Sequence, residues 1–323
     1  MAALQKAQLR RRTSARDASA SWPLADRIGL GLCWAAGLAL CLVAAAIVLF
    51  FAYKGLTELR PSLLFERPTG DVDQSRAGGF LDPILGTLLL TATGIAIAVP
   101  IAVGVAIWLV EFGRPAPLAR AVESGVEIIA GTPSIVLALF GLTVFSNTVF
   151  GFLSQSPEGV GAYGRSILIS GVVMSVIALP LVVGATREAL QTVPAHVREA
   201  SYALGKSKAA TVRRVLLPSI RPGIATGTAL GMGRIIGDTA IVIILAGGTL
   251  QLEAAGGVPG LGTLRGTGST LTTYIFENSP AGEGNAPQKA YAAAAVLLVI
   301  VILLNYIAAK VARGGREVQQ WSR

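Results

Sequence analysis

An arginine and an aspartate lie four residues apart inside a stretch that is otherwise apolar. Arg234 and Asp238 both fall within the run 223–248. If a helix enters a membrane near Pro222, Arg234 lies about 18 Å along it, close to the bilayer midplane. Charges at that depth usually face a bundle interior or a water-filled cavity and mark a pathway. Arginine carries donors that suit a tetrahedral oxyanion, and a nearby carboxylate would let the anion leave again.

Helical spacing places both charges beside small residues. In a continuous helix, Gly223, Gly227, Gly231, Arg234 and Asp238 fall within an arc of about 80°. Glycines at four-residue spacing allow a neighbouring helix to approach closely. We therefore expect the two charges to face the bundle interior or a subunit interface. A structural ion pair that only orients helices is the alternative.

A second cluster interrupts the apolar run 126–150. Gly131-Thr132-Pro133-Ser134 combines a flexible residue with a proline that cannot donate a backbone hydrogen bond. We expect this cluster to break or kink the helix and to turn backbone groups toward a polar cavity. A simple packing kink remains the alternative.

The composition is that of an integral membrane protein. Of 323 residues, 53% are hydrophobic and 14% are charged, the mean hydropathy is +0.64, and soluble proteins carry about 25% charged residues. The net charge of +9 does not imply nucleic-acid binding, because the basic residues concentrate in segments between apolar runs. His196 is the only histidine, and Cys33 and Cys41 both lie in the first apolar run. These facts exclude a histidine-based catalytic triad or metal cluster and predict no metal or other cofactor.

Each of the apolar runs is long enough for the roughly 20 residues that cross a bilayer as a helix. They lack the alternation of barrel strands, so helices are predicted. The predicted fold is an all-α polytopic membrane domain over 28–313 with six transmembrane helices. These lie at about 28–53, 83–110, 126–150, 166–186, 223–248 and 290–312.

The distribution of basic residues predicts the orientation. With the N-terminus inside, 19 of the 27 lysines and arginines fall on the cytoplasmic side, as the positive-inside rule requires. The tails 1–27 and 314–323 are then both cytoplasmic. The glycine-rich loop 249–289 is external, and its partly apolar middle, Leu271–Phe276, would suit the membrane interface.

A basic block, 187–222, separates the fourth and fifth runs. It has helical composition and no proline between Pro194 and Pro218. Gly205 is the one residue in it that readily allows a sharp turn. We therefore predict a short helix, a turn and a second short helix on the cytoplasmic surface, where a soluble partner could dock.

The spacing in this block resembles the EAA signature of ABC importer permeases. In that family the loop inserts into a cleft on the ATPase subunit, so the resemblance implies a separate ATPase partner. Ser201 replaces an alanine and Val215 an isoleucine. The positions implied for ATPase docking are Glu199, Ala200, Ser201, Gly205, Leu217 and Pro218.

The same block contains a pattern that resembles a phosphate-binding loop. Ala200–Ser207 fits a relaxed Walker A motif. Such a loop needs a preceding strand and a glycine-rich backbone, and neither is present. Nucleotide binding by this chain is therefore not predicted.

The segment from Arg234 to Thr239 is similar to the Arg-x-x-Gly-Glu-Thr motif of phosphate-specific ABC permeases of the PstA and PstC kind. Ala130–Val136, Leu179-Pro180, Thr186–Glu188 and Ala189–Pro194 are also similar. The resemblance implies the type I, MetI-like permease fold. It also implies that the arginine and acid of this motif serve phosphate passage. The predicted pathway residues are Arg234, Asp238, Thr239, Thr132 and Ser134.

Two positions depart from that family. Asp238 stands where a glutamate is usual, and Gly184 stands where many members have an arginine, with Arg187 the nearest. Some segments are closer to PstA and others to PstC, which leaves open the choice between the two subunits.

The sequence therefore predicts a permease subunit of an ATP-driven phosphate importer in a bacterial inner membrane. It is a transport subunit and not an enzyme. The expected partners are a homodimeric ABC ATPase, a second related permease and a periplasmic phosphate-binding protein. The alternatives are a permease for another oxyanion, such as molybdate or sulfate, and an ion-coupled secondary transporter. The secondary transporter would leave the Glu199–Pro218 spacing unexplained, and no Ser/His/Asp set supports a membrane enzyme.

Overall fold

The computed structural model describes residues 24–69, 75, 78–154, 164–249, 252 and 261–313. Nearly all of the predicted N-terminal tail, 1–27, and the whole C-terminal tail, 314–323, lie outside these residues. The described residues form helices and contain no strand, only two isolated bridges. The prediction of an all-α fold is confirmed.

The chain divides into two units, Met1–Tyr53 and Lys54–Arg323. The described part of the first unit belongs to one long helix, α2 (Leu24–Glu58), which continues into the start of the second unit. Its apolar length is sufficient to cross a membrane, as the run 28–53 predicts.

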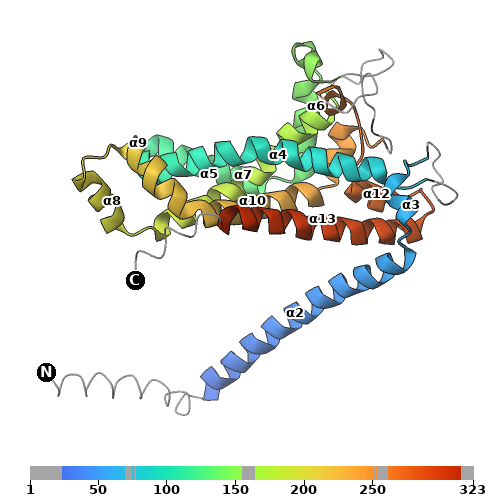
Figure 1. Cartoon of the computed structure of the whole chain (residues 1–323), viewed down its shortest axis with the longest axis horizontal. Coiled ribbons are helices and arrows are strands. Elements are labelled where there is room, and N and C mark those ends of the chain that lie inside the picture. The colour runs from blue at the N-terminus through green and yellow to red at the C-terminus, as the bar shows by residue number, and fades with distance from the viewer. Residues whose placement is uncertain are drawn as a thin grey trace. The chain divides into compact units, whose positions relative to one another are not determined.

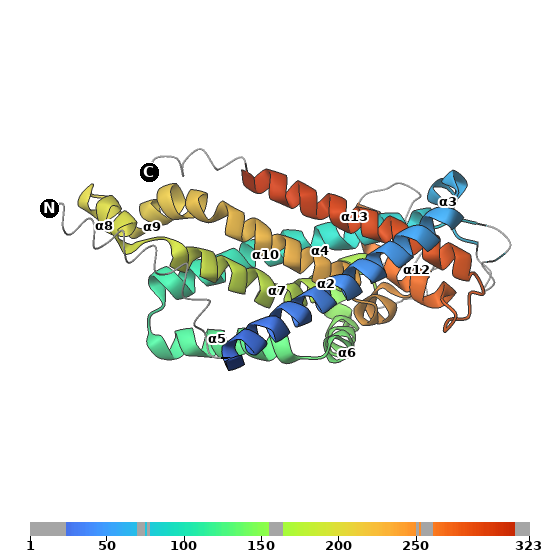
Figure 2. The same ribbon diagram turned by 90° about the horizontal axis from the view of Figure 1, so that it is seen from below.

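Four long helices build the second unit: α4 (Leu81–Ile107), α7 (Ile167–Thr192), α10 (Leu217–Gly237) and α13 (Pro287–Arg313). They run alongside one another, with α7 and α13 both packed against α10 and α4 packed against α7 (Figure 1, Figure 2). Most of the shorter helices lie at the two ends of this bundle, whereas α5 (Ala116–Gly131) lies against α7. The shorter elements are α3 (Pro61–Phe65), η2 (Trp108–Phe112), α5 (Ala116–Gly131), α6 (Ser134–Phe145), η3 (Thr148–Leu153), α8 (Ala195–Ala203), α9 (Lys208–Thr211), η4 (Val212–Leu216), η5 (Val242–Ala246), α11 (Leu261–Arg265) and α12 (Leu271–Asn278).

Glycines allow α10 to lie against α7. A Cβ atom added at Gly223 would collide with the Cβ of Ala189, and one added at Gly231 would lie 3.1 Å from Val182. A side chain at Gly223 would therefore force the helices apart, and one at Gly231 would require the Val182 methyl group to move. The expected role of the glycine spacing is confirmed.

The bundle contains a sharp break where the sequence predicts one. Helices α5 and α6 are bent by 107° at Thr132-Pro133, and α6 points away from the long helices (Figure 1). Proline disfavours helical geometry in the residue before it and lacks a backbone donor. The cluster Gly131–Ser134 therefore separates two helices.

The run 223–248 also breaks, in contrast to the continuous span predicted for it. α10 ends at Gly237, Asp238 has an extended backbone with φ −86° and ψ 123°, and the chain becomes helical again only at Ala240. By length and composition, the described helices provide four candidate spans, or five if α5 and α6 form one. The interrupted run 223–248 is not among them, so the predicted count of six is not established.

Candidate functional site

The break after α10 is held together by local hydrogen bonds. Asp238 is 5% exposed, and its Oδ1 accepts a hydrogen bond of 3.0 Å from the backbone N–H of Ile241. This is the geometry by which aspartate caps the start of a helix. On the other side of the break, the hydroxyl of Thr272 in α12 donates to the carbonyl of Ile236 at 2.6 Å. The Asp238 carboxylate thus caps the helical segment that follows α10.

This arrangement corrects the expected relation between Arg234 and Asp238. The prediction placed both on one face of a continuous helix, but the helix ends at Gly237 between them. The ion pairs among the described residues do not include one between these two side chains. The aspartate is used as a helix cap, which removes it from the face that carries the arginine.

Arg234 lies on an open face of α10. Gly233, Arg234 and Gly237 are exposed, whereas Ile235 and Ile236 are buried. A Cβ atom added at either of these two glycines would meet nothing within 4 Å. No other described residue forms a hydrogen bond or ion pair with Arg234. All N–H donors of its guanidinium group are therefore unpaired among the described residues. The glycines on either side leave the helix backbone next to it uncovered by side chains.

The other predicted pathway residues lie at or next to the two helix breaks. Thr132 and Ser134 are half-buried on either side of the bend between α5 and α6, and the Thr132 hydroxyl donates to the carbonyl of Ile128 at 2.7 Å. Thr239 directly follows Asp238 and is half-buried. α6 packs in one core cluster with the segment after Thr239. The two breaks therefore belong to neighbouring elements.

Many family members have an arginine at the position of Gly184. Arg187 is the nearest arginine in this chain, but its side chain is already paired. Its Nη2 atom lies 2.6 Å from Oε1 of Glu123 in α5, and both side chains are partly exposed. A Cβ atom at Gly184 would meet nothing within 4 Å. Arg187 thus ties α7 to α5 at the end of the bundle near α8.

The block 187–222 has the predicted helix-turn-helix form. α8 ends at Ala203, and the chain turns at Gly205, whose φ of +73° lies in the left-handed region that favours glycine. Ser207 then caps α9 by accepting a hydrogen bond from the N–H of Ala210 at 3.3 Å. Both short helices lie at one end of the bundle in both views (Figure 1, Figure 2).

The predicted docking positions differ in their exposure. Glu199, Ala200 and Gly205 are exposed, and Leu217 and Pro218 are half-buried. Ser201 is only 6% exposed, and its hydroxyl forms a 2.8 Å hydrogen bond with that of Thr211. Ser201 therefore joins α8 to α9, whereas the surface that a partner can touch is formed by its neighbours.

An arginine outside every predicted site, Arg198, connects this loop to the end of α4. Arg198 in α8 donates from Nε to Oε1 of Glu111 at 2.9 Å. Its two terminal nitrogens donate to the carbonyls of Val193 at 2.6 Å and Leu190 at 2.9 Å. The Arg198 and Glu111 side chains are 19% and 8% exposed, so little water screens the pair. Glu111 lies in η2, the π-helical turn that ends α4.

Lys208 gives α9 a link to the same turn. Its Nζ donates to the Glu111 carbonyl at 3.4 Å and lies 5.8 Å from the centre of the Phe112 ring. Both helices of the loop therefore contact η2. No spacing pattern in the sequence connects Glu111 with residues so far along the chain, and the apolar setting of Glu111 is the only signal that it needs a partner.

The family profile described as "Binding-protein-dependent transport system inner membrane component" matches residues 94–316. The chain belongs to this family. The permease is therefore a transport subunit, and ATP hydrolysis belongs to a separate ATPase subunit.

Relatives agree with this assignment. The permease is 31% identical over 301 residues to phosphate transport system permease protein PstC 2 of Mycobacterium tuberculosis, covering 87% of this chain and 90% of the relative. It is 30% identical over 242 residues to PstA 1 of the same species, covering 75% and 72%.

Solved structures share its fold. An inward-facing MetNI methionine ABC transporter matches with a TM-score of 0.53 and 20% identity, covering 73% of this chain and 94% of that chain. A bacterial alginate ABC transporter in complex with its periplasmic protein matches with a TM-score of 0.54 and 19% identity, covering 85% and 94%. These likenesses confirm the predicted permease fold.

Proposed function

We propose that this permease forms part of the phosphate path of an ATP-driven importer. The observation that carries the proposal is the unpaired guanidinium of Arg234 on an open face of α10. Its planar donors match the oxygens of a tetrahedral anion. The names of the relatives, which are phosphate transport permeases, support phosphate as that anion.

A second permease completes the path in this proposal. A charged residue at the centre of a helix that faces lipid costs about 2.5–3.5 kcal/mol by insertion scales. Another protein surface or a water-filled space should therefore cover the face that carries Arg234. A related subunit that offers an equivalent open face would enclose the anion between the two chains.

The remaining features of the importer follow from the predicted topology. Both tails are cytoplasmic, and α10 with the segment 240–246 forms one interrupted crossing, which gives six in all.

A periplasmic phosphate-binding protein delivers the anion from outside. On the cytoplasmic side, each subunit of a homodimeric ATPase docks on one permease through the exposed positions Glu199, Ala200 and Gly205. Arg198 and Lys208 then pass the motion of the docked loop to α4 through η2.

The substrate is tested by reconstitution of the complete transporter in vesicles. With the second permease, the ATPase and the binding protein present, ATP-dependent uptake of radiolabelled phosphate is expected. Molybdate and sulfate serve as competing anions. Uptake of either in preference to phosphate would assign another oxyanion, and uptake without ATP would favour an ion-coupled transporter.

Docking is tested by charge reversal on the exposed surface of the loop. Glu199→Lys is expected to reduce co-purification of the ATPase and to lower phosphate uptake. Glu283→Lys is the matched control, because it reverses an exposed acid in the external loop 249–289. Equal ATPase recovery with the two variants would contradict docking at α8.

A further inference from the structure

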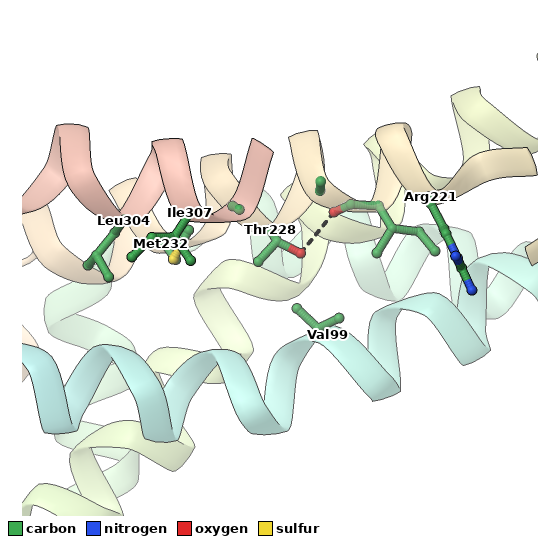
Figure 3. Close-up of a pocket in the computed structure, with 9 residues that line it drawn as sticks. Val99, Arg221, Thr228, Met232, Leu304 and Ile307 are labelled. Carbon is green, nitrogen blue, oxygen red and sulfur yellow. Dashed lines mark hydrogen bonds between the residues drawn. The ribbon is translucent and has the colours of Figure 1, made fainter. Parts of the chain in front are cut away.

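We propose that a groove between α4, α10 and α13 binds one anionic phospholipid. The groove has a volume of about 540 Å³, which lies in the range of small-molecule sites. In Figure 3, Met232, Leu304 and Ile307 gather at one end of it, and Arg221 lies at the other. The lining residues are Val99, Arg221, Ile224, Ala225, Thr228, Met232, Leu304, Ile307 and Ala308.

The walls of the groove suit a hydrocarbon chain. Apart from Arg221 and Thr228, every lining side chain is apolar. The Thr228 hydroxyl donates to the backbone carbonyl of Ile224 at 2.8 Å, so its proton is already used (Figure 3). A free inorganic phosphate would find one cation and no further donor among these side chains. Burial of a polar group without hydrogen bonds is unfavourable, so most of the occupant must be apolar.

The end of the groove near the loop 187–222, called the coupling loop below, suits an anionic headgroup. Arg221 is exposed, and no other described residue forms a hydrogen bond or ion pair with it. Other basic residues stand close by in the chain: Arg213 and Arg214 are exposed in η4, and Lys310 is exposed two residues beyond Ala308 in α13. Basic sites at the cytoplasmic ends of membrane helices attract anionic lipid headgroups.

The length of the groove matches one leaflet of a bilayer. At about 1.5 Å per residue, α10 advances about 16 Å from Arg221 to Met232. A hydrocarbon core is about 30 Å thick, so this distance is about half of it. A lipid with its phosphate at Arg221 would therefore reach the middle of the membrane beside Met232, as a lipid of the cytoplasmic leaflet does.

The experiment measures phospholipid retained by the purified transporter complex. Native mass spectrometry after detergent washing, followed by reloading with equal amounts of phosphatidylglycerol and phosphatidylcholine, gives both occupancy and preference. Ile307→Trp fills the groove, and Leu303→Trp places the same side chain on an exposed position of α13 that does not line it. Arg221→Gln removes the charge and keeps the walls.

Wild type and Leu303→Trp are expected to retain phosphatidylglycerol, and Ile307→Trp is expected to lose it at least tenfold. Arg221→Gln should retain lipid but lose its preference for phosphatidylglycerol. Equal retention by the two tryptophan variants, or an unchanged preference in Arg221→Gln, would overturn the proposal. Displacement of the lipid by inorganic phosphate would also overturn it, because the site would then be an anion site.

A helix of the second permease could fill the groove instead of a lipid, and cross-linking tests this alternative. With Cys33 and Cys41 replaced by serine, Ile307→Cys labelled with a thiol-reactive photocross-linker should not become joined to the second permease on illumination. A high yield of that cross-link would overturn the lipid site. Both measurements are made without phosphate transport, so failure of the lipid site leaves the proposed transport function untouched.

Discussion

The two polar regions of the bundle treat their charged residues in opposite ways. At the coupling loop, Arg198 and Glu111 are largely buried and bonded to each other, and Lys208 adds a second link to η2. At the break after α10, Arg234 has no described partner and Asp238 bonds to backbone. The first region satisfies its charged groups within the protein. The second leaves one cation without a described partner, as the proposed phosphate path requires.

The largest expected effect comes from breaking the bonded region. Glu111→Ala leaves Arg198 buried without its carboxylate, and loss of one partner of such a pair costs about 3–5 kcal/mol. The carbonyls that also hold Arg198 should keep the loss near the lower end of that range. The thermal unfolding temperature of the purified complex should fall, and transport per ATP hydrolysed should fall with it.

Glu123→Ala is the matched control for this variant. It removes the partner of Arg187, and that pair is 41% and 33% exposed. Exposed pairs contribute about 0–1 kcal/mol, so little change is expected. Equal losses in the two variants would remove the distinction between the largely buried ion pair and the exposed one.

The next effect concerns the unpaired cation. Arg234→Gln should lower phosphate uptake by about 10–100-fold, because hydrogen bonds to charged groups contribute about 1.5–3 kcal/mol each. Assembly with the ATPase should persist, since Arg234 holds no described residue. Arg120→Gln, which neutralises an exposed arginine of α5, should transport normally. Normal uptake by Arg234→Gln would exclude it from the substrate path.

A smaller effect tests whether α8 and α9 move as one piece. Ser201→Ala alone leaves the buried hydroxyl of Thr211 unsatisfied, which costs about 1–3 kcal/mol. The double variant Ser201→Ala with Thr211→Val removes both hydroxyls and should recover most of that stability. Chemical denaturation of the wild type, Ser201→Ala, Thr211→Val and the double variant gives the coupling energy between the two hydroxyls. Additive losses would show that the hydroxyls do not hold the helices together.

The smallest effect lies in α12, at the opposite end of the bundle from α8. Burial raises the pKa of Glu277 from its ordinary value of 4.5 to about 7. The fold therefore favours the protonated form, so its stabilising contribution is present below about pH 4.5 and is lost as the pH rises through about 7. Glu277→Gln should flatten the fall in unfolding temperature over that range. The exposed Glu283→Gln should keep the wild-type profile.

Local sequence signals predicted the turns and one of the two breaks. Gly205 adopts a left-handed conformation, and Thr132-Pro133 separates α5 from α6, because the backbone chemistry of glycine and proline acts at the residue itself. The helix end at Gly237 was missed because Asp238 was interpreted only as a charge within a span. Aspartate after glycine is also a common start of a new helix, and that signal was present.

The contacts that fix the coupling loop could not be predicted from local patterns. Ser201 stands at an alanine position of the docking motif, yet it is buried against Thr211. Arg198 is one basic residue among seven in its block, and its partner Glu111 comes from a different helix. Such pairings are set by how distant segments pack, so composition and periodicity do not reveal them.

The glycine contacts between α7 and α10 have a mechanical consequence. These helices adjoin the two ends of the loop 187–222. They approach closely where Gly223 meets Ala189 and where Gly227 meets the backbone of Val182. Helix, loop and returning helix therefore form a closely packed hairpin, in which α7 and α10 lie against each other along one face. In the proposed importer, a push on the loop 187–222 would tilt α7 and α10 together and shift Arg234 relative to the second permease.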